Sequence, residues 1–335
     1  ATGYWLLSTL CPMHAIRMTQ TGGPEVLEWM EVPAGEPGPG EIRVSVAAAG
    51  LNYIDTYHRS GLYPLDLPSG LGMEAAGVVT AVGEGVTDLR AGDRVAYASG
   101  PLGACAESRC MPADRVVALP DGIDDRTAAA AMLKGLTAQY LLRRTYRVQA
   151  GETILFHAAA GGVGLIACQW AKRLGATVIG TVGSEVKAEI ARAHGCDHVI
   201  DYRQEDVAER VREITDGAGV PVVYDGVGKD TWTASLDSLA RFGMMVSFGN
   251  ASGAVPPVAP IELSTKGSLY LTRPTLLDYA AAHEDLVAGA EELFGVISDG
   301  SVRIEIDQTY PLANAADAHR DLEARKTTGS SVLLP

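Results

Sequence analysis

The pattern of apolar and polar positions changes character near residue 128. Before that point, short apolar runs such as 41–47, 76–82 and 94–98 are separated by glycine and proline, most densely in the loop 35–40. Short runs bounded by such turn-forming residues are typical of β-strands. The first part of the chain is therefore predicted to form a barrel-like all-β unit.

Beyond residue 128 the pattern predicts strands that alternate with helices. An alanine-rich helix is expected over 128–142. Strands are expected at 153–158, 176–182, 198–200, 221–225, 243–248 and 268–272, and helices at 162–174, 184–194, 205–215 and 231–240. Such alternation indicates right-handed crossovers and a parallel sheet. The tail is predicted to be helical at 285–298 and 313–325, with a strand at 304–306.

A glycine-bearing turn separates the first of these strands from the first helix. It reads Ala159-Ala160-Gly161-Gly162-Val163-Gly164, the dinucleotide-binding fingerprint with alanine in the first glycine position. Gly161 would let the backbone approach a pyrophosphate, and Gly164 would let the helix pack closely on the strand. The alternative is a tight turn without a ligand. His157, within the strand, is interpreted as a packed core histidine.

The choice between the two nicotinamide cofactors depends on a position about 20 residues further on, at the end of the second strand. Gly183 and Ser184 stand there instead of an acid, so a 2′-phosphate would meet no direct repulsion. Glu185 is the competing acidic candidate. Nearby residues that favour a phosphate are Lys187, Tyr202 and Arg203. The sequence predicts NADPH rather than NADH.

Composition and charge narrow the classes of partner. Hydrophobic residues make up 47% of the 335 positions, enough for a sizeable core. Acids outnumber bases 41 to 27, a net charge of −14. A binder of nucleic acid or of an anionic membrane surface would need an excess of lysine and arginine, so both are disfavoured.

Cysteine usage and apolar run length bear on the compartment. The five cysteines are scattered without a CxxC pair, so neither a disulfide framework nor a zinc ribbon is indicated and a cytoplasmic setting is expected. No apolar run approaches the roughly 18 residues that would span a bilayer. Residues 1–12, which precede Met13, are expected to be a tag or extension.

Several longer motifs resemble the quinone oxidoreductase, or zeta-crystallin-like, branch of the medium-chain dehydrogenase/reductase superfamily. They are Asn52-Tyr53-Ile54-Asp55-Thr56-Tyr57, Arg59-Ser60-Gly61-Leu62-Tyr63-Pro64, Leu133-Lys134-Gly135-Leu136-Thr137-Ala138, Val246-Ser247-Phe248-Gly249-Asn250 and Leu271-Thr272-Arg273-Pro274. The resemblance runs from about Met13 to Pro335. It implies an α/β protein with a GroES-like β-barrel catalytic domain (13–138 and 275–335) and a Rossmann, doubly wound nucleotide-binding domain (139–274).

The zinc alcohol dehydrogenases of the same superfamily carry ligands that this sequence lacks. Met73 of Gly72-Met73-Glu74 stands where their histidine ligand is expected. Asn52 and Tyr53 lie near the position of their first cysteine ligand. Their structural-zinc lobe has four closely spaced cysteines, whereas only Cys105 and Cys110 fall in that region here. No metal is therefore predicted.

The resemblance also implies site residues. Tyr57 and Asn52 are the candidate catalytic residues, with the Tyr57 hydroxyl donating to a developing phenolate oxygen. The alternative is that Tyr57 only packs against the nicotinamide. The implied cofactor contacts are Tyr53, Ile54, Asp55, Tyr57, Lys134, Thr137, Gly162, Val163, Gly183, Ser184, Lys187, Tyr202, Val227, Phe248, Gly249, Asn250, Ser252, Leu271, Thr272, Arg273 and Arg325. For either arginine the alternative is a solvated surface charge.

The leading hypothesis is an NADPH:quinone oxidoreductase that acts without zinc on a small-molecule quinone in the cleft between the domains. An NADPH-dependent enone or enoyl reductase is the enzymatic alternative. The non-enzymatic alternative is an AU-rich RNA-binding or crystallin-like structural protein, and the acidic charge disfavours RNA. A homodimer is expected through the edge strand at 268–272, as in the superfamily.

Overall fold

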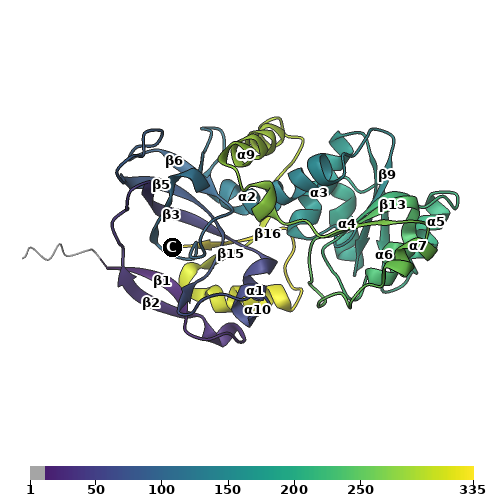
Figure 1. Cartoon of the computed structure of the whole chain (residues 1–335), viewed down its shortest axis with the longest axis horizontal. Coiled ribbons are helices and arrows are strands. Elements are labelled where there is room, and N and C mark those ends of the chain that lie inside the picture. The colour runs from purple at the N-terminus through teal and green to yellow at the C-terminus, as the bar shows by residue number, and fades with distance from the viewer. Residues whose placement is uncertain (1–11) are drawn as a thin grey trace, which may run out of the picture. The chain divides into compact units, whose positions relative to one another are not determined.

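The structure, a computed structural model, describes residues 12–335 (Figure 1). The extension expected over residues 1–12 lies, apart from Pro12, outside this range. The chain divides into two units. The β unit comprises the described part of Ala1–Ala130 together with Thr309–Ala324 and Val332–Pro335. The parallel-sheet unit comprises Ala131–Gln308 and Arg325–Ser331.

The β unit is built on a seven-stranded and a three-stranded sheet. The larger follows the order β15-β16-β3-β5-β6-β8, with β7 paired to β3, and the smaller follows β2-β1-β4. The pairs of β3 with β5 and β7 are antiparallel, as is that of β1 with β2. The strands are β1 Pro12–Met18, β2 Glu28–Pro33, β3 Glu41–Leu51, β4 Ser69–Gly70, β5 Glu74–Val82, β6 Arg94–Tyr97, β7 Ser108–Pro112, β8 Val117–Ala118, β15 Ile306–Pro311 and β16 Ser330–Leu334.

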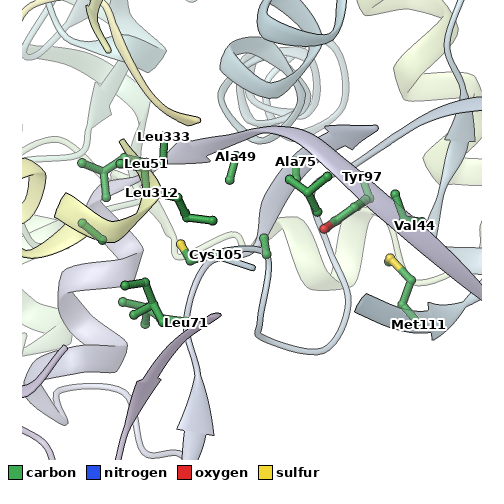
Figure 2. Close-up of a cluster of buried hydrophobic side chains, with 14 of the residues drawn as sticks. Val44, Ala49, Leu51, Leu71, Ala75, Tyr97, Cys105, Met111, Leu312 and Leu333 are labelled. Atoms are coloured by element: carbon green, nitrogen blue, oxygen red, sulfur yellow. The ribbon is translucent and has the colours of Figure 1, made fainter. Parts of the chain in front are cut away.

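The core of the β unit follows from the two-residue period of its strands. On β3, Ile42, Val44 and Val46 are buried, while Ser45 between them is exposed. Figure 2 shows this cluster, in which Leu312 and Leu333 join side chains from the first part of the chain. The C-terminal segment thus completes a core whose other side chains come from the first part of the chain, beginning with Ile16.

The helices of the β unit are short. They are α1 Tyr53–Ser60, α10 Ala315–Glu323 and the 3-10 turns η1 Pro24–Val26, η2 Ala113–Arg115 and η4 Leu312–Asn314. The sequence pattern did not predict α1. Its ends explain why it forms: Asn52 and Asp55 make a reciprocal capping box at the start, and Gly61 ends the helix with φ at 82°.

The parallel-sheet unit has the strand order β11-β10-β9-β12-β13-β14, which confirms the doubly wound prediction. The pairs of neighbouring strands in this sheet are all parallel. The strands are β9 Thr153–Phe156, β10 Thr177–Val182, β11 His198–Asp201, β12 Val220–Asp225, β13 Leu239–Ser247 and β14 Tyr270–Thr272. The order reverses between β9 and β12, so ligands are expected outside the carboxyl ends of those strands.

The parallel-sheet unit also contains most of the helices. They are α3 Gly162–Arg173, α4 Glu185–Ala193, α5 Val207–Ile214, α6 Trp232–Ser238, α7 Pro260–Thr265, α8 Leu276–Tyr279 and α9 His283–Ser298. Of these, α3, α4, α5 and α6 contact its strands. The alanine-rich helix is α2, Asp125–Tyr140, which continues into a π-helical turn, η3 Leu141–Thr145. Within residues 12–335 the helices are all too short or too polar to cross a membrane.

The predicted elements beyond residue 128 are found within a few residues of their expected bounds, whereas helices α7 and α8 were not predicted. The strand expected at 304–306 lies at Ile306–Pro311, and β16 was not predicted. Residues 131–138, 275–308 and 325–331 belong to the parallel-sheet unit, whereas the sequence analysis expected them in the barrel domain.

Candidate active site

The fingerprint turn follows β9 and opens α3. Ala158 adopts a left-handed backbone with φ at 55°. A Cβ on Gly164 would lie 2.4 Å from the Ala158 carbonyl oxygen, so only glycine fits there. No side chain among residues 12–335 caps α3, and the backbone at its start forms a bridge between Gly161 and Gly329. The first turn of a helix is a common site for an anion.

Lys134 of α2 lies against this turn. A Cβ on Gly162 would fall 2.8 Å from Lys134 Cδ, and Lys134 itself is buried. Thr137, one helical turn further on, is also buried, and its Oγ1 donates to the Leu133 carbonyl oxygen at 2.7 Å. The Thr137 hydroxyl can therefore serve a ligand only as an acceptor.

The end of β10 has the features expected of a phosphate pocket. A Cβ on Gly183 would lie 2.4 Å from the Tyr202 hydroxyl oxygen, so any side chain at 183 would displace Tyr202. Ser184 caps α4 by accepting a hydrogen bond from the Lys187 backbone N–H at 3.4 Å. The strand end is thus shaped without an acidic side chain at 183 or 184.

Three cations converge beside this strand end. Lys187 Nζ donates to the Arg325 carbonyl oxygen at 3.2 Å. Burial and the nearby charges of Arg325 and Arg203 lower the pKa of Lys187. Like charges held together at a half-buried position indicate a site for an anion.

Glu185, the acidic residue that could instead bind the adenosine ribose, forms an ion pair with Arg192. Its Oε1 accepts from Arg192 Nη1 at 2.7 Å on the exposed face of α4. The pair lies along the helix, seven residues apart. The alternative of a Glu185-bound ribose is therefore not favoured.

The turns after β12 and β13 are tied together. Ser252 donates to the Val227 carbonyl oxygen twice, from its backbone N–H at 2.8 Å and from Oγ at 2.9 Å. A Cβ on Gly249 would lie 2.3 Å from the Gly226 carbonyl oxygen, so the two turns touch through their backbones. Phe248, before Gly249, packs on Phe156 of β9 at 5.8 Å between ring centroids.

The side chain of Arg273 is hydrogen-bonded to the protein and is therefore more than a solvated surface charge. Its Nη1 donates to the Gly249 carbonyl oxygen at 3.0 Å and to Ser247 Oγ at 3.3 Å. With the amide of Asn250 oriented to match, Asn250 Oδ1 accepts from Arg273 Nη2 at 3.1 Å. Arg273 thus fixes the turn after β13 from its position just beyond Thr272, the last residue of β14.

In the β unit the predicted residues gather on α1. The Asn52 backbone N–H donates to Asp55 Oδ2 at 2.8 Å, and Asn52 Nδ2 donates to Glu74 Oε2 at 2.7 Å. Glu74 is fully buried. Sequence reasoning considered Glu74 only as part of a missing zinc motif. The clue to its role is Gly50, where a Cβ would lie 2.2 Å from Glu74 Oε2.

An aromatic cluster surrounds Tyr57. Its ring centroid lies 5.6 Å from that of Tyr53 and 5.2 Å from that of Tyr63. Tyr53 and Tyr57 are four residues apart and therefore share a face of α1. Tyr57 is 8% exposed, and Ile54 beside it is half-buried.

A buried ion pair anchors α1, and the sequence analysis did not predict it. Arg59, 2% exposed, donates to Glu323 Oε1 at 2.7 Å and to Oε2 at 2.9 Å. Its Nη1 also lies 3.2 Å from His319 Nδ1. Two separate segments, α1 and α10, are thereby joined at one point. Arg59 and Glu323 are separated by 264 positions in the sequence, which explains why no local pattern revealed the pair.

The residues at the zinc-ligand positions of related enzymes have other contacts in this protein. Met73 is buried at the entry to β5, and Glu74 is bound to Asn52. Burial raises the pKa of the Cys105 thiol. Across residues 12–335, no three or more His, Cys, Asp or Glu side chains converge to hold a metal ion.

Comparison with known proteins identifies the family. Residues 38–148 match the alcohol dehydrogenase GroES-like domain, and residues 162–289 match the family described as zinc-binding dehydrogenase. A quinone oxidoreductase of Pseudomonas aeruginosa is 62% identical over 96% of this chain and 99% of its own length. The chain belongs to the quinone oxidoreductase branch of the medium-chain dehydrogenase/reductase superfamily.

Other members of this superfamily are also similar to the chain. The Escherichia coli quinone oxidoreductase, solved in complex with NADPH, has a TM-score of 0.95 and 53% identity, covering 96% of this chain and all (100%) of that one. A 2-haloacrylate reductase of Burkholderia is 48% identical over 94% of this chain and 96% of its own. The expected fold class and family are thereby confirmed, while the assignment of individual site residues stays a prediction.

Proposed function

We propose that this protein is an NADPH:quinone oxidoreductase that works without zinc. The observation that carries the cofactor assignment is the convergence of Lys187, Arg203 and Arg325 at the end of the second parallel strand. An NADPH complex of a relative with 53% identity supports the same assignment. When bound, NADPH would supply hydride to a quinone, and a solvent proton completes the hydroquinone.

The chain's own residues would bind and orient the cofactor. The N-terminal turn of α3 would bind the pyrophosphate, with Lys134 adding positive charge beside Gly162. Lys187, with Arg203 and Arg325, would bind the 2′-phosphate. The fixed turns that carry Val227, Gly249 and Asn250 would shape the remaining surface, together with Leu271 and Thr272 at the end of β14.

We assign the quinone side of the reaction to α1. Tyr57 would donate a hydrogen bond to the oxygen that gains negative charge, while Tyr53 and Tyr63 pack around its ring. Asn52 would keep its geometry through Glu74. A quinone needs no Lewis acid, because its reduction gains aromaticity and spreads the charge over the ring. The engagement of Glu74 and the thioether of Met73 support zinc independence.

Reduction of an activated carbon–carbon double bond is the second candidate, favoured by the 48% identity to a 2-haloacrylate reductase. A substrate panel separates the two. Initial rates under NADPH are measured with 1,4-benzoquinone, 9,10-phenanthrenequinone, a small enone and 2-chloroacrylate. The proposal expects both quinones to be reduced fastest. Faster reduction of the enone or of 2-chloroacrylate would overturn it in favour of the second candidate.

We further propose a homodimer that forms through β14. This strand is the sheet edge, and apolar side chains are exposed on and near it: Phe242, Ile261, Tyr270 and Leu271 are 60%, 68%, 60% and 38% exposed. An apolar edge strand needs a cover, and a second copy supplies one. A monomeric mass by light scattering at micromolar concentration would refute the dimer.

A cytoplasmic location is the compartment we propose. The four described cysteines, Cys105, Cys110, Cys168 and Cys196, are free thiols. Free thiols are typical of a reducing compartment.

A further inference from the structure

A chain of buried polar side chains lies beneath the turns that follow β9 and β12, and the proposed function gives it no role. It consists of Thr181 on β10, His157 after β9, Ser235 on α6 and Asp225 at the end of β12. All four are at most 1% exposed. Burial of so many polar groups is costly unless each is hydrogen-bonded, and here they bond to one another.

The contacts run in an unbroken line. His157 Nδ1 lies 3.0 Å from Thr181 Oγ1, and His157 Nε2 lies 3.0 Å from Ser235 Oγ. Ser235 Oγ in turn donates to Asp225 Oδ2 at 2.8 Å. The line therefore joins three strands of the sheet to α6.

The carboxylate of Asp225 determines which group donates and which accepts in each of these hydrogen bonds. Asp225 can only accept, so the Ser235 hydroxyl proton points to it, and Ser235 Oγ must accept from His157 Nε2–H. His157 Nδ1 then carries no proton and accepts from the Thr181 hydroxyl. Burial lowers the pKa of His157, in keeping with a neutral ring.

Both ends of the line hold backbone N–H groups of cofactor-facing turns. Asp225 Oδ1 accepts from the Val227 and Gly228 N–H groups at 2.8 and 3.0 Å. At the far end, Thr181 Oγ1 accepts from the Ala158 N–H at 3.4 Å. Ala158 is the residue with positive φ that begins the fingerprint turn.

The carboxylate of Asp225 accepts hydrogen bonds from four groups. Thr231 Oγ1 adds a fourth donor at 2.7 Å to its Oδ2, and no lysine or arginine of residues 12–335 forms an ion pair with it. A carboxylate that accepts several hydrogen bonds forms stronger bonds than a neutral acceptor would. The carboxylate of Asp225 therefore strengthens the hydrogen bonds from the Val227 and Gly228 N–H groups, which hold the turn after β12.

We propose that Asp225, Ser235, His157 and Thr181 are positioning residues that hold the fingerprint turn and the turn after β12 in one geometry for the cofactor. This inference rests on the proposed cofactor site. The four residues do not touch the reacting atoms in this role. Their effect is on the affinity for NADPH and not on the turnover of the loaded enzyme.

Asp225→Asn makes a distinctive change. An asparagine oxygen can still accept from Val227 and Gly228, but its amide N–H would face Ser235 Oγ. Ser235 would then donate to His157 Nε2, and the ring proton would move to Nδ1, which donates to Thr181. The substitution is therefore expected to switch the His157 tautomer, an effect that a purely structural role would not produce.

The first experiment reads that tautomer in the full-length protein without cofactor, by two-bond ¹⁵N–¹H correlation of the histidine rings. We expect His157 to carry its proton on Nε2 in the wild type and on Nδ1 in Asp225→Asn. A wild-type proton on Nδ1, or an unchanged tautomer in the variant, would overturn the network as described.

The second experiment measures the Kd of NADPH by calorimetry for a matched pair. Thr181→Val removes the hydroxyl at nearly constant volume, and Thr181→Ser keeps it. Thr181→Val and Asp225→Asn are expected to raise Kd about tenfold, the value of one or two hydrogen bonds, while Thr181→Ser stays near wild type. Turnover at saturating NADPH should change less than about twofold in all of them.

Ser238→Ala is the control on the same helix, because the Ser238 hydroxyl bonds only to the Ala234 carbonyl oxygen within α6. It should leave Kd unchanged. If Thr181→Val binds NADPH as tightly as Thr181→Ser, the positioning role is overturned. A wild type that does not bind NADPH would overturn the proposed function and this role with it, whereas unchanged Kd values in the variants of an NADPH-binding wild type overturn the role alone.

Discussion

At the residue scale, the choice of cofactor depends on a handful of charges beside the end of β10. Lys187 lies close enough to Arg203 and Arg325 for their charges to lower its pKa, and Glu185 is held by Arg192. A negatively charged ligand would relieve the repulsion among the three cations. The sequence revealed Lys187 by its distance from the fingerprint, whereas Arg325 was expected near the cofactor from the family resemblance alone.

Reversing the charge at residue 187 should weaken the preference of the enzyme for NADPH over NADH. In Lys187→Glu, kcat/KM for NADPH is expected to fall on the order of tenfold to a hundredfold, because one charge-assisted contact to the 2′-phosphate becomes a repulsion. Efficiency with NADH should change little. Arg210→Glu, on exposed α5, is the control and should leave both values near wild type. Equal losses with the two cofactors would contradict the assignment.

Tyr57 is expected to assist the reaction without being essential. Tyr57→Phe should lower turnover with 1,4-benzoquinone by less than about a thousandfold, since the quinone ring itself spreads the developing charge and one positioned proton donor contributes typically ~10²–10⁴-fold. Tyr310→Phe, which removes a hydroxyl bonded to Asp321 in the same unit, is the control. A greater loss at Tyr57 would mark it as an essential acid.

At the element scale, the elements that the sequence predicted well are those whose structure follows from a local pattern. The strands and helices around the fingerprint are examples, because each buries a continuous apolar run. Helix α1 escaped prediction because Tyr53, Ile54 and Thr56 are weak helix formers, and its stability comes from its caps and from Arg59. Strand β16 escaped because it pairs with β3, far away in the sequence.

The role of Arg59 in anchoring α1 can be tested by measuring the free energy of unfolding. Arg59→Gln removes a buried guanidinium that binds Glu323 with two hydrogen bonds, and we expect a loss of about 2–4 kcal/mol in the free energy of unfolding. This range is below that for a fully buried pair because the Glu323 side chain is 37% exposed. Urea denaturation followed by far-UV circular dichroism measures it.

Arg320→Gln is the matched control on α10, where Arg320 pairs with Asp317 on the exposed face. Exposed pairs contribute roughly 0–1 kcal/mol, so the control should lie close to wild type. Equal midpoints for Arg59→Gln and Arg320→Gln would show that the buried pair does not anchor the helix.

At the scale of the whole molecule, two buried histidines predict sensitivity to acid. Burial and the nearby Arg59 charge lower the pKa of His319 to about 3, and burial lowers the pKa of His157. Both lie below the ordinary value of 6.5, so the unfolded chain binds more protons below that pH. Their stabilising effect is complete above pH 6.5 and declines as the pH falls toward the folded-state pKa values.

Urea midpoints between pH 7.5 and pH 5 test this dependence. Each histidine should remove up to about 1.4 kcal/mol per pH unit below 6.5. His319→Gln, which stays neutral, should flatten part of the slope. A wild-type midpoint that stays constant down to pH 5 would contradict the pKa assignment.

The central claim is that a 2′-phosphate pocket and a zinc-free quinone site make this chain an NADPH:quinone oxidoreductase. The most direct measurement is the ratio of kcat/KM for NADPH to that for NADH, with 1,4-benzoquinone as acceptor and the wild-type enzyme. The account predicts quinone reduction with a ratio of at least about ten, the value of one charged contact. Equal efficiencies with the two cofactors, or no quinone reduction with either, would contradict it.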